Sequence, residues 1–344
     1  MRSAFAQDNF PDTPANHRAY EAITSLGGPE DWYRLLLGQT SYEQVAQTYR
    51  DVSALGSRLT GSKGESATFD YVQARLAELG ARSITRTPFT VSVPDPQATG
   101  TLSVGSASSA VYPLWPNLVR TSTCNVSGPL IYAGRARLED LNGLDIKGSI
   151  AVAEFDSGSN WRNLAKLGAV GIVFIQPTSM ARAEAEAKFA SVPLEIPRFY
   201  LPSKAAGPIL SAAFAHQVGH LSCRQDWVRR TSCNLSASFS GSDPSLASHP
   251  IVLMAYSDSM SIVPGLCPGA ESIGGVAGLL EVARVYSICT HKRPLQVILS
   301  GSHSLALRGS REYVEELLHQ GGAPLLVVSL DLSSGSTSIG SYGR

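Results

Sequence analysis

Apolar residues repeat with two different periods near the start of the chain. Up to about residue 61 the pattern is mixed, with short helical segments. A capping box at 62–65 then opens a helix whose apolar residues share one face until Gly80. Over 83–93 the period changes to two, which predicts a strand, and Pro88 within it favours the edge of a sheet.

The pattern of predicted elements changes between Pro94 and about Arg230. The predicted segments there are short, rich in β-formers and interrupted by glycine and proline. A strand, a helix, a strand and a further strand are indicated in turn by GSIAVAEF, NLAKLGAVGIVFIQP and VPLEIPRFYLP. We expect 95–230 to form a small β-rich α/β unit inserted in a larger domain. It carries no nucleophile or ligand cluster, so its expected role is to shape or cover a cleft.

Long elements return from about residue 234. Apolar strands are predicted at 250–255, 295–299 and 325–330, and helices at 274–288 and 309–319. Unbroken apolar strands that alternate with helices indicate an α/β fold, with a mixed, mostly parallel sheet and helices on both faces. The expected division is an N-terminal helical segment that begins this domain (1–94), the insert (95–230) and the rest of the α/β domain (231–344), which we expect to be C-terminally incomplete.

Charge and hydropathy narrow the classes of partner. Lys+Arg and Asp+Glu are equal at 28 each, so the chain has no net field for nucleic acid, and none is expected as a partner. No apolar run approaches the roughly 20 residues that cross a bilayer, so a membrane link would need segments absent from this chain. Ala4-Phe5-Ala6 resembles the end of an export leader, which predicts an exported, periplasmic or extracellular protein or a membrane-protein ectodomain.

The five cysteines form no Cys-x-x-Cys pair, so neither a zinc knuckle nor a thioredoxin-like site is indicated. Two states stay open for Cys223 and Cys233. They form a bridge in an oxidising compartment, or they are buried free thiols.

Several motifs together resemble one family. The resemblance is to the catalytic domain of the co-catalytic zinc aminopeptidases, metallopeptidase family twenty-eight, and covers about residues 45–340. It is carried by SRLTGSKGESATFDYVQARLAELG, PIVLMAYSDSMSIVPGLCPGAESIGGVAGLLEVARVYS, RPLQVILSGSHSLALRGSREYVEEL and PLLVVSLDLSS. The insert is similar to the protease-associated domain of that family through 147–150, 165–175 and Ile196-Pro197. The resemblance implies a zinc-exopeptidase-like fold and, in intact members, a pair of zinc ions.

The residues that bind and activate zinc in that family are largely replaced. Its His-x-Asp reads Tyr256-Ser257-Asp258, so the orienting Asp258 remains while the histidine ligand is lost. A neutral phenol with a pKa near 10 is a poor zinc ligand. The family's Glu-Glu pair, which includes the general base, reads His303-Ser304. No carboxylate between Glu281 and Glu312 can replace that base.

Two carboxylates keep positions that match metal ligands of the family, Glu271 and Asp331. Each also has a simpler explanation, because a carboxylate is favoured near a helix N-terminus and at a strand end it caps loops. His303 could ligate a metal, serve as a base for Ser302 or Ser304, or make loop hydrogen bonds. A serine-hydrolase elbow is not favoured, because the sequence after Ser302 lacks the closing glycine.

The resemblance therefore implies a degenerate, inactive branch of the family. AYSDSM combined with SGSHSLAL is similar to a branch fused to membrane segments. We expect a non-catalytic ectodomain that binds peptide or protein and holds no cofactor, with zinc at a vestigial site as the other option. The alternative is an active metal-dependent aminopeptidase or hydrolase whose rearranged site holds one metal on Glu271, Asp331 and His303.

Overall fold

The computed structural model describes residues 30–189, 194–267, 269–289, 291–321 and 324–332. The leader-like Ala4-Phe5-Ala6 lies outside these ranges. The chain forms two compact units. It passes between them within two long strands, β1 (Arg82–Pro94) and β9 (Trp227–Phe239), and again on either side of the segment 260–267. Unit 2 comprises 91–230 and 260–267, and unit 1 contains the remaining described residues. The sequence predicts 260–267 as part of the C-terminal division, whereas in the structure this segment packs with unit 2.

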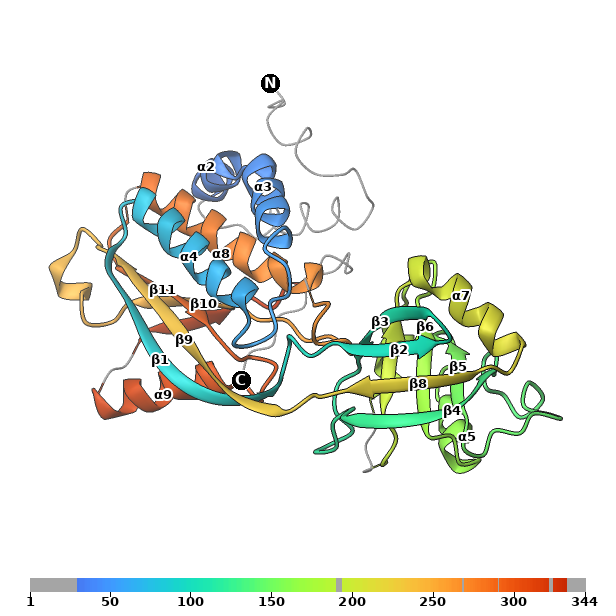
Figure 1. Ribbon diagram of the computed structural model, residues 1–344. Helices are drawn as coiled ribbons and strands as arrows, with labels where there is room; N and C mark the ends of the chain where they lie inside the picture. The colour runs from blue at the N-terminus through green and yellow to red at the C-terminus, as the bar shows by residue number, and fades with distance from the viewer. Residues whose placement is uncertain (1–29, 190–193, 268, 290, 322–323, 333–344) are drawn as a thin grey trace, which may run out of the picture. The chain divides into compact units, whose positions relative to one another are not determined.

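Unit 1 is built on a mixed five-stranded sheet with the order β1-β9-β11-β10-β12 (Figure 1). Its other strands are β10 (Ile251–Tyr256), β11 (Leu295–Ser300) and β12 (Leu326–Ser329). β10 lies parallel to both β11 and β12, while β11 runs antiparallel to β9. β1 occupies an edge, as Pro88 predicted, because proline cannot donate a ladder hydrogen bond.

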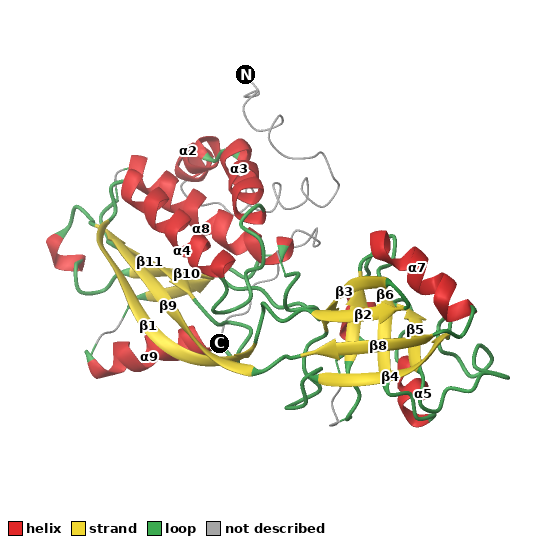
Figure 2. Ribbon diagram, in the orientation of Figure 1, coloured by secondary structure: helices red, strands yellow, loops and turns green. Residues whose placement is uncertain are grey.

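Helices cover both faces of this sheet, as the unbroken apolar strands predicted (Figure 2). The helices of unit 1 are α2 (Glu30–Gln39), α3 (Tyr42–Ser53), α4 (Lys63–Glu78), α8 (Ala270–Ile288) and α9 (Arg308–His319), with a short 3-10 helix at Pro244–Leu246. Leu253 and Ala255 of β10 point to the face covered by α4 and α8. Val252 and Met254 point to the other face, where they pack with Tyr313 of α9. The mixed α/β fold class is therefore confirmed.

Helix α4 begins where the capping box predicted. Ser62 is its N-cap, and the Ser62 hydroxyl accepts a hydrogen bond from the Glu65 amide at 3.3 Å. Phe69, Val72 and Leu76 are buried in the core beneath it. The predicted start of α8 at residue 274 was wrong, because the helix already begins at Ala270, after the left-handed Gly269.

Unit 2 is a sheet that closes on itself in the order β2-β3-β7-β6-β5-β4-β8 (Figure 1). Its strands are β2 (Gly100–Val104), β3 (Ala107–Pro113), β4 (Cys124–Tyr132), β5 (Ile150–Glu154), β6 (Gly171–Ile175), β7 (Arg198–Leu201) and β8 (Val218–Cys223). Its helices are α5 (Trp161–Lys166), α6 (Arg182–Glu186) and α7 (Ser203–Phe214). β5, α5, β6 and β7 follow each other as the sequence predicted. The assignment of this unit as a protease-associated domain stays a prediction.

Within the described ranges, no helix is long and apolar enough to cross a membrane.

Candidate functional site

The candidate site lies at the carboxyl ends of the parallel strands of unit 1. Tyr256 ends β10 and pairs in register with Ser300 at the end of β11. The Ser257 amide continues this pairing with a hydrogen bond of 2.8 Å to the Ser300 carbonyl. The loops after both strands therefore start side by side, which is where open α/β sheets place their ligands.

Asp258 is the centre of a hydrogen-bond network in these loops. Its side chain is buried, with the residue 1% exposed. Oδ1 accepts a hydrogen bond from the His303 amide at 2.7 Å. Oδ2 accepts hydrogen bonds from the Ser304 amide at 3.0 Å, the Ser304 hydroxyl at 2.5 Å and the Thr60 hydroxyl at 3.3 Å. The carboxylate thus holds the loop after β11 and the segment before α4.

The loop after β11 has an unusual backbone. Ser302, Ala306 and Leu307 all have positive φ angles, between 54° and 58°, in a region that side chains rarely adopt. Ser302 is 0% exposed, so its hydroxyl cannot reach an external substrate as a nucleophile. The amides of His303 and Ser304, which directly follow Ser302, both donate hydrogen bonds to Asp258. This indicates that Asp258 holds the loop in this conformation.

Tyr256 takes up the space next to His303 and Asp331. Its ring stacks on the His303 imidazole, with centroids 4.0 Å apart and an interplanar angle of 12°. Its hydroxyl donates a hydrogen bond of 2.7 Å to Oδ1 of Asp331, an exposed carboxylate that follows β12. Burial, followed by the hydrogen bond to Asp331, raises the pKa of the Tyr256 phenol, which therefore stays neutral at physiological pH.

The candidate site residues are thus only partly brought together. Asp258, His303 and Asp331 lie in one network, in which Tyr256 stands between the last two. The side chain of Glu271 lies outside the described part of the structure, so its role as a metal ligand stays a prediction. The roles predicted for Asp258, His303 and Asp331 stay predictions as well.

The side chains that the structure describes at this site do not fit a dinuclear zinc centre. Such a centre needs histidine and carboxylate ligands with free lone pairs, and a separate glutamate as base. Here Tyr256 and His303 stand at the positions of a histidine ligand and of the glutamate base, and Asp258 accepts four hydrogen bonds from protein groups. In the part of the chain that the structure describes, no group of three or more His, Cys, Asp or Glu side chains is placed to hold a metal ion.

Two buried charged residues next to this network were not identified from the sequence. Arg58 is 0% exposed and donates hydrogen bonds to the carbonyls of Ser257 at 2.9 Å and Gly269 at 2.5 Å. It thereby connects the loop after β10 to the start of α8. Glu65 is 2% exposed, and the capping box had identified it only as part of a helix start.

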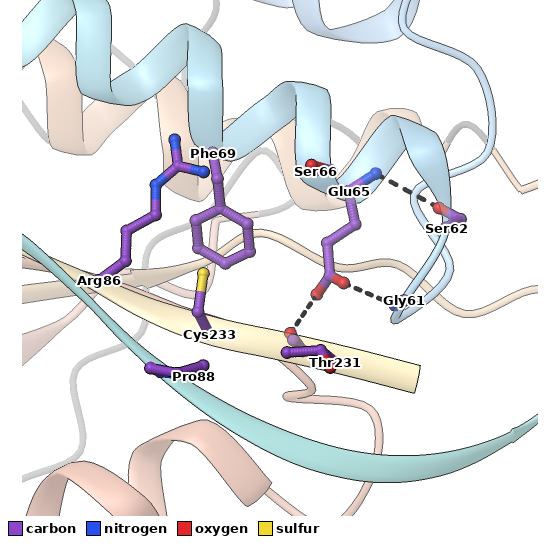
Figure 3. Close-up of a pocket in the computed structure, with 10 residues that line it drawn as sticks. Gly61, Ser62, Glu65, Ser66, Phe69, Arg86, Pro88, Thr231 and Cys233 are labelled. Atoms are coloured by element: carbon purple, nitrogen blue, oxygen red, sulfur yellow. Dashed lines mark hydrogen bonds between the residues drawn. The ribbon is translucent and has the colours of Figure 1, made fainter. Parts of the chain in front are cut away.

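Glu65 reaches from α4 into the sheet beside a small cavity (Figure 3). Its carboxylate accepts hydrogen bonds from the Gly61 amide at 2.6 Å, the Ser232 hydroxyl at 2.9 Å and the Ser257 hydroxyl at 3.3 Å. Burial raises the pKa of Glu65 to about 7, and the charge of Asp258 acts in the same direction, while the hydrogen bond from Gly61 lowers it. The cavity has a volume of about 310 Å³ and is lined by residues of α4, β1 and β9 and the turn before α4.

The Tyr256 hydroxyl is expected to contribute little to stability. Tyr256→Phe removes one hydrogen bond to an exposed carboxylate that water can solvate instead, so the free energy of unfolding should fall by about 1 kcal/mol or less. Urea denaturation measures this change, with Tyr42→Phe at an exposed tyrosine as the control. A loss of several kcal/mol would show that the phenol is a central support of the site.

Comparisons with known proteins agree with this geometry at the level of the fold. No protein-family model matches the chain. A zinc aminopeptidase from Bacillus subtilis superimposes with a TM-score of 0.54 at 20% identity, over 80% of this chain and 65% of that one. A peptidase M28 precursor from Shewanella amazonensis gives a TM-score of 0.53 at 20% identity, over 85% of this chain and 74% of that one.

A curated relative is similar over a shorter range. The BOS complex subunit ncln of Danio rerio is 40% identical over 83 residues, which are 22% of this chain and 14% of the relative. The chain thus matches a small part of that protein and about two thirds of the Bacillus enzyme. The two superpositions confirm the fold that the sequence motifs implied: the chain has the fold of the family twenty-eight zinc aminopeptidases.

Proposed function

We propose that this chain is a non-catalytic member of the zinc aminopeptidase fold, in which the former metal site has become a structural support. The observation that carries the proposal is the set of four hydrogen bonds on the buried carboxylate of Asp258. An aspartate that orients a histidine ligand must direct an oxygen at the imidazole. Here no histidine occupies the position of Tyr256, and Asp258 instead binds the amides of His303 and Ser304.

The loss of the base supports the same proposal. Hydrolysis of a peptide by metal-bound water needs a group that removes a proton from that water, and the family uses a glutamate. His303 stands at that position, and its ring is stacked on Tyr256. The rival site, with one metal on Glu271, Asp331 and His303, would place a cation beside the Tyr256 phenol, which donates to Oδ1 of Asp331 and stacks on His303.

Binding of a peptide or protein is the function we propose in place of hydrolysis. The Danio rerio relative is named as a subunit of a complex, so we propose that this chain is likewise a subunit of a protein assembly. Unit 2, which we propose is a protease-associated domain, would contribute to the binding surface. We further propose an exported or membrane-associated ectodomain as its location, in line with the leader-like Ala4-Phe5-Ala6.

Metal content and peptidase activity test the proposal together. The purified full chain, incubated with zinc and then desalted, is expected to retain far less than one zinc per chain and to hydrolyse no aminoacyl-p-nitroanilide. Elemental analysis and an absorbance assay measure the two quantities, with the Bacillus subtilis enzyme as the positive control.

Asp331→Ala separates true activity from contamination. Any residual hydrolysis should be the same for the wild type and this variant, because Asp331 is not expected to hold a metal. Stoichiometric zinc together with turnover that Asp331→Ala abolishes would overturn the proposal in favour of a rearranged hydrolase.

A further inference from the structure

Two cysteines of unit 2 lie directly opposite each other on neighbouring strands. Cys124 begins β4 and Cys223 ends β8, and the antiparallel register of these strands makes them Cα partners. Residues opposite each other in such a pair direct their side chains to the same face. Here it is the inner face, because Cys223 belongs to the apolar core of the closed sheet and Cys124 packs against that core.

The spacing of such partners suits a disulfide. Opposite residues of an antiparallel pair have Cα atoms about 4.5 to 5.5 Å apart. A disulfide spans Cα distances of roughly 4.4 to 6.8 Å. The general spacing of antiparallel partners therefore matches the span of a disulfide, so that side-chain rotation can bring the Cys124 and Cys223 sulfurs together.

The other cysteines are placed differently. Cys233, the partner considered from sequence spacing, lies on the part of β9 that belongs to unit 1, whereas Cys223 belongs to unit 2. Cys233 packs instead against the core beneath α4 and α8. The strand register thus favours Cys124 over Cys233 as the partner of Cys223.

We propose that Cys124 and Cys223 form a disulfide that joins β4 to β8 when the chain folds in the presence of a disulfide donor. The donor is a small-molecule disulfide, such as glutathione disulfide, or a thiol–disulfide oxidoreductase. One cysteine thiolate attacks the donor and releases a first thiol, and the second cysteine then displaces the remaining donor thiol. The two cysteine thiols lose two protons and two electrons, and the donor disulfide is reduced to two thiols.

Burial determines when the bond can form. It raises the pKa of the Cys124 thiol to about 11 and that of the Cys223 thiol to about 12, so few thiolates exist at neutral pH in the folded chain. Exchange requires a thiolate that the donor can reach. The disulfide should therefore form during folding, and should form much more slowly when a donor is added to the folded, reduced protein.

Peptide mapping distinguishes the possible pairings. Trypsin should release Cys124 in peptide 121–135, Cys223 in 205–224, Cys233 together with Cys267 in 231–284, and Cys289 in 285–292. The full chain is unfolded, reduced, refolded with reduced and oxidised glutathione, alkylated and digested. Mass spectrometry is expected to find 121–135 linked to 205–224, and the link should disappear after reduction.

Variants connect the bond to stability. The oxidised wild type should unfold at a temperature roughly 5 °C or more above the reduced protein. Cys124→Ser and Cys223→Ser should each abolish that difference, while Cys289→Ser should keep it. A link between 205–224 and 231–284, or free thiols at Cys124 and Cys223 after refolding, would overturn the proposal. Neither result depends on whether the chain binds zinc, so this test is independent of the proposed function.

Discussion

Asp258→Ala is expected to lower the free energy of unfolding by about 4 kcal/mol, the largest loss that we predict for a single substitution in this chain. The change removes the acceptor for the amides of His303 and Ser304 and for the hydroxyls of Ser304 and Thr60. These donors would be left without a partner in a site where Asp258 itself is 1% exposed. Urea denaturation followed by circular dichroism measures the loss.

Asp258→Asn serves as the milder variant in case the alanine protein does not fold. Its amide oxygen can still accept one backbone hydrogen bond, and its NH₂ group can donate to the hydroxyl of Thr60. One backbone amide loses its partner, so we expect about half the loss of Asp258→Ala. Asp331→Ala is the matched control, because Asp331 is also a strand-end carboxylate but is exposed.

The response to chelators separates a structural role of Asp258 from a metal-orienting one. If Asp258 supports the loops directly, the difference between wild type and Asp258→Ala should be the same with zinc and with EDTA. The opposite result would be that zinc stabilises the wild type and that EDTA abolishes the stability difference between the wild type and Asp258→Ala. Asp258 would then still orient a metal ligand.

Local patterns in the sequence were sufficient to predict most of unit 1. The predicted strands at 250–255 and 295–299 are short, mostly apolar runs, and β10 and β11 are buried as such runs indicate. The similar run at β12, an edge strand, is largely exposed. The start of α8 was missed because residues 270–273 directly follow a proline- and glycine-rich stretch, which favours a loop. A Cβ at Gly275 would lie 2.6 Å from the Leu330 carbonyl, so the absence of a side chain there permits the close approach of α8 to the segment that follows β12.

The candidate site was harder to predict from the sequence, because its central contacts join residues that are far apart in the chain. The family resemblance assigned Asp258 to the orienting aspartate and His303 to the position of the base, and in the structure the His303 amide donates a hydrogen bond to Asp258. It gave no indication of Thr60, which bonds Asp258 from 198 positions away. Glu65 fits a capping box so well that its pattern offers no reason to expect a buried carboxylate beside Ser257 and Ser232.

Glu65 should make the protein less stable as the pH rises from about 4.5 to about 7. Its pKa in the folded protein is raised to about 7 from an ordinary value of 4.5, so the folded state binds more protons than the unfolded state across this interval. Stability falls with pH wherever the folded state binds the extra proton. At about 1.4 kcal/mol for each pKa unit, the total loss attributable to Glu65 is roughly 3 kcal/mol, and it is complete above pH 7.

Glu65→Gln is expected to remove this pH dependence. The amide oxygen of glutamine can accept from the Gly61 amide while its NH₂ group faces the hydroxyls of Ser232 and Ser257, so the hydrogen bonds of the neutral acid are approximately kept. Unfolding free energies should be measured from pH 4 to pH 8. The free energy of unfolding of the variant should rise relative to that of the wild type by roughly 3 kcal/mol over this range. Glu78→Gln, at an exposed glutamate of the same helix, should leave the wild-type profile unchanged. Parallel profiles for wild type and Glu65→Gln would mean that Glu65 is already ionised in the folded protein at pH 5, in which case the charge beside Asp258 must be balanced within the network.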